Sequence, residues 1–188
     1  IRANPYHQFY YEVADSIRMK WTNARILINA TTGRYSIVSA VSNNPPVSAA
    51  KFRRYPVRSS DFVLQTNDYD VNWPIFRYAE VLLMKAEALN ELGQTAAAID
   101  LVDEIRLRAG LGETPAVSQA DVRIAIWKER RLELAFEHDR FFDLVRTGQA
   151  QAAFAADGKT FVVGKHEVFP LPQKFINEAG GLSSQNNY

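Results

Sequence analysis

Three glutamates at helical spacing are the residues of this sequence that come nearest to a catalytic site. Glu129, Glu133 and Glu137 are spaced i, i+4 and i+8, so on a helix they would form one stripe. Paired carboxyl groups are the chemistry of a glycoside hydrolase, whose retaining members hold them about 5–5.5 Å apart. The alternative is a structural ladder of carboxylates, neutralised by neighbouring arginines.

The surrounding residues favour the structural interpretation. Adjacent arginines lower the pKa of a carboxyl group, whereas a general acid needs a raised pKa. Glu129 and Glu133 also fall within an apolar stripe, where a charge is costly unless it is paired. We therefore predict no catalytic residue and a structural ion-pair network made of Glu129, Arg130, Arg131, Glu133, Glu137 and Arg140.

The helix that would carry these glutamates is apolar on two sides. A helix apolar on both sides is expected to be sandwiched between other elements. Ser118 is placed to cap its first turn, so we predict a helix over 119–137. A shorter helix is expected over 140–146, ended by Gly148. The two faces hold Val122, Ile126, Leu132 and Phe136 on one side, and Ile124, Trp127, Leu134 and Ala135 on the other.

Other reactive chemistries lack the residues that they need. The chain has no cysteine, and its three histidines do not have metal-ligand spacing. The acidic residues near 61–72 lack the closing glutamate of a calcium loop, and Gly110 with Gly112 is too weak a pattern for a phosphate loop. We predict no metal and no cofactor.

Two further helices would complete a mainly α fold. Residues 75–92 and 95–109 end at Gly93 and Gly110, and Pro74 is expected in the first helical turn. The pair is similar to a tetratricopeptide unit, with small residues at the contact. Ala86 and Ala98 would allow the close approach, and the seam would be filled by Leu82, Leu89, Val102 and Ile105.

Short β-hairpins and long irregular loops are expected on either side of these helices. Alternating residues predict a hairpin from 24–30 and 34–41, and a second at 160–169 with its turn at Gly164. Pro170 and Pro172 are expected to hold the tail extended.

Three ordered segments resemble the SusD/RagB family. They are PIFRYAEVLLMKAEA at 74–88, ERRLELAFE followed by RFFDLVRTG at 129–148, and a tail running from FPLP at 169–172 to QNNY at 185–188. The resemblance covers roughly the last two-thirds of the chain. It implies a SusD-like α-α superhelix with tetratricopeptide-like helix pairs.

The resemblance also implies a function. Members of the SusD/RagB family are non-catalytic glycan-binding lipoproteins of the cell surface, which pass oligosaccharide to a SusC-like TonB-dependent transporter of the outer membrane. The chain starts at Ile1 without a signal peptide and without a cysteine to carry lipid. The expectation is a C-terminal fragment of a longer protein, anchored through an upstream lipidated cysteine.

Composition is consistent with one globular domain over 1–188. It would comprise an irregular and hairpin part at 1–73, a helical core at 74–148, and a hairpin and tail at 149–188. Net charge is +1, from 22 basic and 21 acidic residues, which argues against a nucleic-acid partner. No apolar run approaches the 18 residues of a membrane span.

Aromatic residues gather in the first part of the chain. Six of eight tyrosines and two of three tryptophans lie within 1–73. Aromatic faces stack on sugars while amides and arginines bind hydroxyl groups, so the candidate carbohydrate-binding residues are Trp21, Asn23, Arg25, Tyr10 and Tyr11. Packing of these rings against the helices is the alternative.

A protein-interaction module without sugar binding is the rival function, and exposed apolar residues on 75–109 would favour it.

Overall fold

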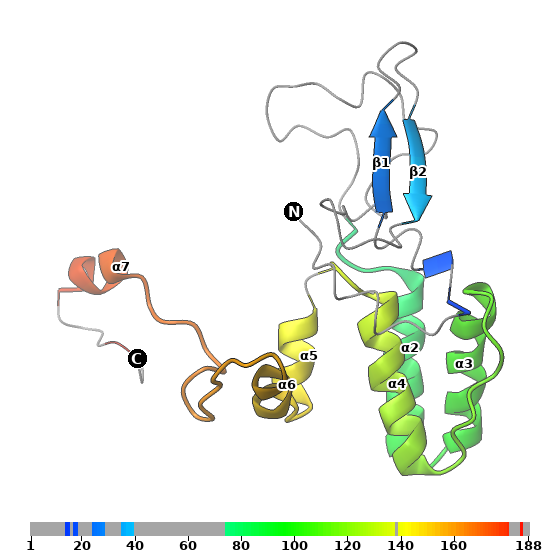
Figure 1. Cartoon of the computed structure of the whole chain (residues 1–188). Coiled ribbons are helices and arrows are strands. Elements are labelled where there is room, and N and C mark those ends of the chain that lie inside the picture. The colour runs from blue at the N-terminus through cyan, green and yellow to red at the C-terminus, as the bar shows by residue number, and fades with distance from the viewer. Residues whose placement is uncertain are drawn as a thin grey trace. The chain divides into compact units, whose positions relative to one another are not determined.

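The computed structural model describes residues 14, 15, 17, 18, 24–28, 35–39, 74–137, 139–180 and 185. The chain divides into two compact units, Ile1–Glu137 and His138–Tyr188, which are described separately. Figure 1 shows their helices and strands.

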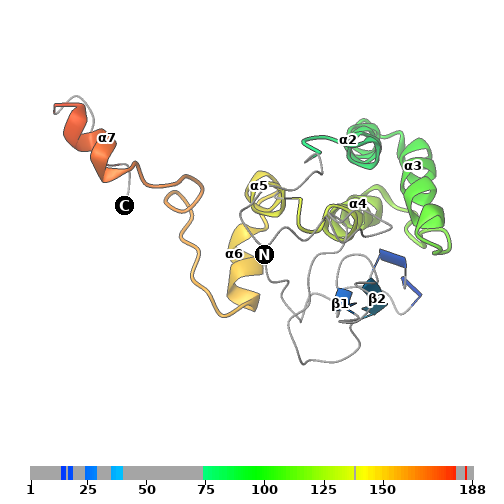
Figure 2. The same ribbon diagram turned by 90° about the horizontal axis from the view of Figure 1, so that it is seen from above.

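Three helices form the core of the first unit. They are α2 (Tyr78–Glu91), α3 (Thr95–Arg108) and α4 (Gln119–Glu133). Seen end-on in Figure 2, they lie at the corners of a triangle, and each packs on the other two. Small residues stand at the contact, as predicted for a tetratricopeptide-like pair. The buried core consists of Ala86, Ala98, Val102, Val122 and Ile126, with Leu82, Leu83 and Ile105 alongside.

Glycines end α2 and α3 as the sequence predicts. Gly93 and Gly110 have φ of 79° and 77°, a left-handed conformation that costs glycine little. The following amide, of Gln94 or Leu111, then donates 2.9 Å to a carbonyl in the last helical turn. The chain can therefore reverse within a few residues and lay α3 against α2.

The start of α2 differs from the prediction. The helix begins at Tyr78, and Arg77 before it is extended, with φ of −139° and ψ of 160°. Pro74 lies outside the first turn, so that placement was wrong. A first helical turn tolerates proline, but nothing in the ring requires a helix to begin at that residue.

Side-chain contacts fix the start of α4. The Ser118 hydroxyl accepts a hydrogen bond from the Asp121 amide at 3.1 Å, which confirms the predicted cap. Buried Asn90 of α2 donates 2.9 Å to the Gln119 carbonyl, and the Gln119 side chain donates 2.6 Å to the Asn90 carbonyl. This reciprocal pair joins the end of α2 to the beginning of α4.

The far end of α4 is shorter than predicted, and only one of its faces is fully covered. The helix ends at Glu133 rather than 137, and Phe136 has φ of 68°. Val122, Ile126 and Leu132 are buried, but Ile124 of the second face is 61 % exposed. The sandwiched interpretation was therefore wrong for that part of the helix.

A two-stranded antiparallel sheet lies earlier in the first unit. Strand β1 (Ala24–Ile28) pairs with β2 (Tyr35–Ser39), and Ile26 stands opposite Ile37. This confirms the first predicted hairpin.

Among its described residues, 139–180 and 185, the second unit holds three short helices. They are α5 (Arg140–Arg146), α6 (Ala150–Ala156) and α7 (Gln173–Glu178). Leu144, Ala150 and Phe161 form its buried core. The hairpin predicted at 160–169 was wrong, because residues 163–167 form turns with no strand beside them. Pro172, expected to hold the tail extended, instead stands directly before α7.

The fold class is mainly α, as predicted. None of the helices in the described part of the chain is long and apolar enough to cross a membrane.

Candidate functional site

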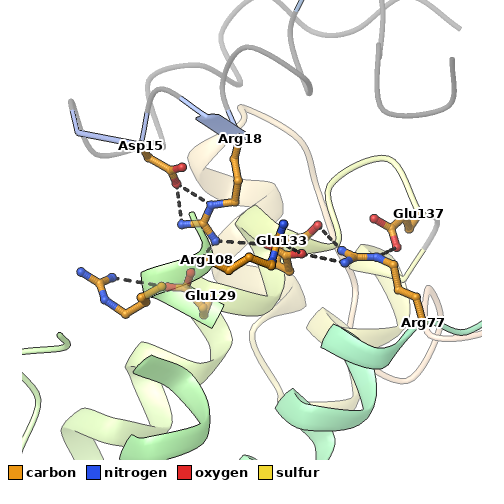
Figure 3. Close-up of polar contacts among 8 residues, drawn as sticks. Asp15, Arg18, Arg77, Arg108, Glu129, Glu133 and Glu137 are labelled. Atoms are coloured by element: carbon orange, nitrogen blue, oxygen red, sulfur yellow. Dashed lines mark hydrogen bonds and ion pairs between the residues drawn. The ribbon is translucent and has the colours of Figure 1, made fainter. Parts of the chain in front are cut away.

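The most concentrated group of charged side chains forms an ion-pair network in the first unit. Figure 3 shows that these side chains converge from four parts of the chain: the N-terminal segment, the residue before α2, helix α3, and α4 with the turn that follows it. The network, as the term is used below, comprises Asp15, Arg18, Arg77, Arg106, Arg108, Glu129, Glu133 and Glu137. Its four acids match its four bases, so the group as a whole carries no net charge.

Glu129 stands at the centre of one half of the network. It is only 1 % exposed, because α4 turns it toward the other elements of the first unit. Arg18 donates through Nη1 to Glu129 Oε1, and Arg106 Nη1 lies 3.4 Å from Oε2. Arg18 also donates through Nε to Asp15 Oδ2 at 2.7 Å. A residue far upstream is thereby tied to the middle of α4.

Glu133 is the centre of the other half. It is 3 % exposed and accepts 2.6 Å from Arg77 Nη1. Arg108 Nη2 donates to both of its carboxylate oxygens, at 2.6 and 2.7 Å, and Arg18 Nη1 lies 3.6 Å away. Three arginines from different segments therefore share one carboxylate.

Arg77 closes the end of α4. Its Nη2 donates 2.5 Å to the Glu133 main-chain carbonyl, one of the groups that a helix end leaves without an intrahelical partner. Its Nε donates 2.6 Å to Glu137 Oε2. The left-handed turn at Phe136 lies between the two glutamates, so they meet the same guanidinium although α4 has ended.

Ionisation in the network favours the charged forms. Burial alone would raise the pKa of Glu133, but the hydrogen bond from Arg77 and the charges of Arg77, Arg108 and Arg18 hold it below its ordinary value. Burial alone would lower the pKa of Arg18, yet its hydrogen bond to Asp15 and the charge of Glu129 raise it. Arg77 has a raised pKa in the same way, through Glu137 and Glu133.

These contacts leave little capacity for acid-base chemistry. A general acid must hold a proton near neutral pH, and the lowered pKa of Glu133 opposes this. Glu129 and Glu133 are also almost wholly removed from solvent, so a substrate could not reach them without displacing arginines. The arrangement is suited to joining segments of the chain.

The arginines that pair with Glu129 are not the sequence neighbours that were predicted. Its described partners are Arg18 and Arg106, and Arg130 instead lies 4.0 Å from Glu80 of α2. Consecutive residues on a helix point about 100° apart, so a neighbour in sequence seldom meets the same carboxylate. Arg131 is half-buried on α4, and Arg140 belongs to the second unit. The places predicted for these two arginines in the network stay predictions.

Five members of the network were not predicted from the sequence: Asp15, Arg18, Arg77, Arg106 and Arg108. Periodicity on one helix cannot identify partners that approach from other segments. Two weaker signals were present, however. Arg77 falls within one of the family-like segments, and Arg106 and Arg108 stand in the last turn of a predicted helix, where cations are favourable.

The candidate carbohydrate-binding residues are not placed by the structure. Trp21, Asn23, Tyr10 and Tyr11 lie outside the described residues, and Arg25 is described only as part of strand β1. Their assignment stays a prediction. Among the residues that are described, no three histidine, aspartate or glutamate side chains are grouped as a metal ion would require.

Comparison with known proteins identifies the family. The sequence profile of the SusD family matches residues 3–188. The chain belongs to the SusD family. This confirms the resemblance found in the three sequence segments.

A curated relative supports the same assignment. The SusD-like protein P2 of Formosa agariphila is 32 % identical over 157 residues, which is 77 % of this SusD-family chain. The match covers 30 % of that relative, so the chain spans less than a third of its length.

Two solved structures share the fold of this SusD-family chain. One, described as a laminarin binding SusD-like protein, is 36 % identical with a TM-score of 0.56, over 81 % of this chain and 31 % of that one. The other is surface glycan-binding protein A from Bacteroides thetaiotaomicron in complex with laminarihexaose. It is 26 % identical with a TM-score of 0.59, over 81 % of this chain and 33 % of that one.

Proposed function

We propose that this chain is part of a non-catalytic, surface-exposed glycan-binding protein of the outer membrane. It would capture oligosaccharide without breaking a bond and pass it to a SusC-like TonB-dependent transporter. One observation carries the proposal: the chain belongs to the SusD family and is 36 % identical to a structure described as laminarin binding. A β-glucan of the laminarin type is therefore the first ligand to test.

The ion-pair network supports a binding function over a hydrolytic one. A glycoside hydrolase would need two carboxyl groups facing a sugar. Glu129 and Glu133 instead face arginines and are buried, and this occupies the oxygens that would act as acid and nucleophile. Replacing either glutamate by glutamine is expected to lower stability, with no hydrolytic activity to lose.

Calorimetric titration of the protein with laminarin and a panel of other polysaccharides tests the proposal. Trp21→Ala is expected to weaken binding about tenfold or more, which corresponds to about 1.4 kcal/mol of lost stacking. Phe142→Ala removes an exposed ring from α5 and is the matched control, with unchanged affinity expected. Equal binding by wild type and Trp21→Ala would refute the role of Trp21. No binding to any glycan would refute the proposed function.

A protein-interaction function is the second candidate, because α2 has an exposed apolar stripe. Tyr78, Val81 and Met84 are 69 %, 47 % and 44 % exposed, on the side of the helix away from the core residues Leu82, Leu83 and Ala86. Side chains of this kind meet the criterion set for a docking face. On this view the wild type binds a protein partner and no glycan, and the double variant Tyr78→Ser, Val81→Ser loses that partner. Glycan binding by the wild type, unchanged in the double variant, would rule this candidate out.

A further inference from the structure

Helix α2 has a second side that is rich in apolar residues, opposite the side that joins the three-helix core. In Figure 2 the helix occupies one corner of the triangle formed with α3 and α4. Its residues Leu82, Leu83 and Ala86 are buried in the core. The other side carries exposed residues that alternate by three and four positions, and we call this row the α2 stripe. It consists of Tyr78, Val81, Lys85, Ala88 and Leu92.

The spacing of the α2 stripe is that of a contact between two helices. Side chains that alternate by three and four positions line the seam along which a second helix packs. Ala88 is small, which lets the axis of such a helix come close. A helix with apolar residues on two sides is expected to lie between other elements, and α3 and α4 pack on its core side. The stripe therefore fits a further helix.

The lengths of the relatives indicate where that helix comes from. The chain covers 30 % of the SusD-like protein P2 and 31 % of the structure described as laminarin binding, so more than half of each relative lies outside the match. Stacked helix pairs bury their apolar faces against neighbouring pairs, and about three or more are needed for stability. Residues 74–137 supply one pair, α2 and α3, together with α4.

We propose that the α2 stripe is covered by a helix from the remainder of the same polypeptide, outside residues 1–188. The inference goes beyond the proposed function, because it holds whether or not the protein binds a glycan. It also gives the exposed residues of α2 a role within the protein, in place of a docking face for a separate partner.

Lys85 defines the chemistry of the covering helix. It stands in the middle of the stripe, between Val81 and Ala88. A charge enclosed in a helix contact is costly unless it is paired, and one polar residue in such a seam fixes the register of the two helices. The covering helix is therefore expected to carry apolar residues at the same alternating spacing, with an aspartate or glutamate opposite Lys85.

Thiol labelling of the full-length protein tests the inference. Residues 1–188 contain no cysteine, so a single introduced thiol reports on its own position once any cysteine in the remainder is replaced by serine. Ala88→Cys is the test variant, and Ala97→Cys is the matched control, because Ala97 is exposed on α3 beside the charged residues Asp100 and Glu104. The maleimide reaction of Ala88→Cys is expected to be at least about tenfold slower than that of the control, since a covered thiol reacts only after local opening.

Two comparisons separate the possible occupants. The reaction rates of the two variants should become equal in concentrated guanidinium chloride, and the protection of Ala88→Cys should not change when the purified protein is diluted to a monomer, as checked by sedimentation. Equal rates in the native protein would show that the stripe is open to solvent and would overturn the proposal. Protection that disappears on dilution would assign the stripe to a second copy and would also overturn it. Val81→Cys repeats the test at a second position if Ala88→Cys does not fold.

Discussion

Replacing Glu133 by glutamine removes the charge that three arginines share. The side chain keeps its size, so the packing around the end of α4 changes little. Arg77 and Arg108 each donate to its oxygens at 2.6 Å, and Arg18 lies 3.6 Å away. The amide of glutamine keeps one acceptor oxygen and turns a donor toward the guanidinium groups.

The cost can be estimated partner by partner. Leaving a buried charge without a partner costs about 3–5 kcal/mol. Here each arginine has an alternative: Arg77 keeps Glu137 and a carbonyl, Arg18 keeps Asp15 and Glu129, and Arg108, with its side chain 57 % exposed, regains water. We therefore expect a loss at or just below the lower limit of this range, about 2–3 kcal/mol, for Glu133→Gln.

Thermal and urea unfolding followed by circular dichroism would measure this loss. For a chain of this size, 1 kcal/mol corresponds to about 2–4 °C in Tm, so a decrease of roughly 5–10 °C is expected. Glu104→Gln on the exposed surface of α3 is the matched control and should change Tm by about 1 °C or less. If Glu133→Gln were as stable as this control, the network would contribute nothing to the fold, and the reasoning above would be refuted.

Two further predictions concern acid and packing. The arginine partners of Glu133, Arg77 first, hold the pKa of its carboxyl group below the ordinary value of about 4.5. The ionised carboxylate therefore contributes fully to stability above about pH 4.5, and this contribution is lost as the pH falls through the lower pKa of the folded state. The difference in free energy of unfolding between wild type and Glu133→Gln should accordingly shrink below about pH 4.5. A difference that stays constant down to pH 2 would contradict this. Ala98→Leu should lower the free energy of unfolding by about 1–3 kcal/mol, since Ala98 is fully buried where α2 and α3 meet. Ala97→Leu, at an exposed position of the same helix, is the control and should change stability little. Equal urea midpoints for the two variants would show that the contact tolerates larger residues.

Most helices were predictable because their signals are local. Gly93 and Gly110 end helices through their own backbone freedom, and Ser118 begins one through its own hydroxyl. The errors occurred where local signals were weak or competed. Phe136 adopts a left-handed conformation that nothing in its side chain favours, so the end of α4 at Glu133 was missed.

The candidate site divides in a similar way. Helical spacing correctly placed Glu129 and Glu133 on the buried side of a helix, since periodicity reports which residues face the core. It could not identify Arg18 or Arg77 as their partners, because these lie 111 and 56 residues away in sequence. Charge pairing over such separations depends on which segments pack together.

The amino-acid sequence alone determined the family, the mainly helical class and the burial of charged residues on one helix. Each of these follows from short-range patterns, in which residue type and spacing act within a few turns. Only the tertiary structure decided which arginines neutralise those carboxylates and that the N-terminal segment is tied to α4 through Arg18. Ion pairing needs groups within a few ångströms, and the packing of distant segments alone creates that proximity.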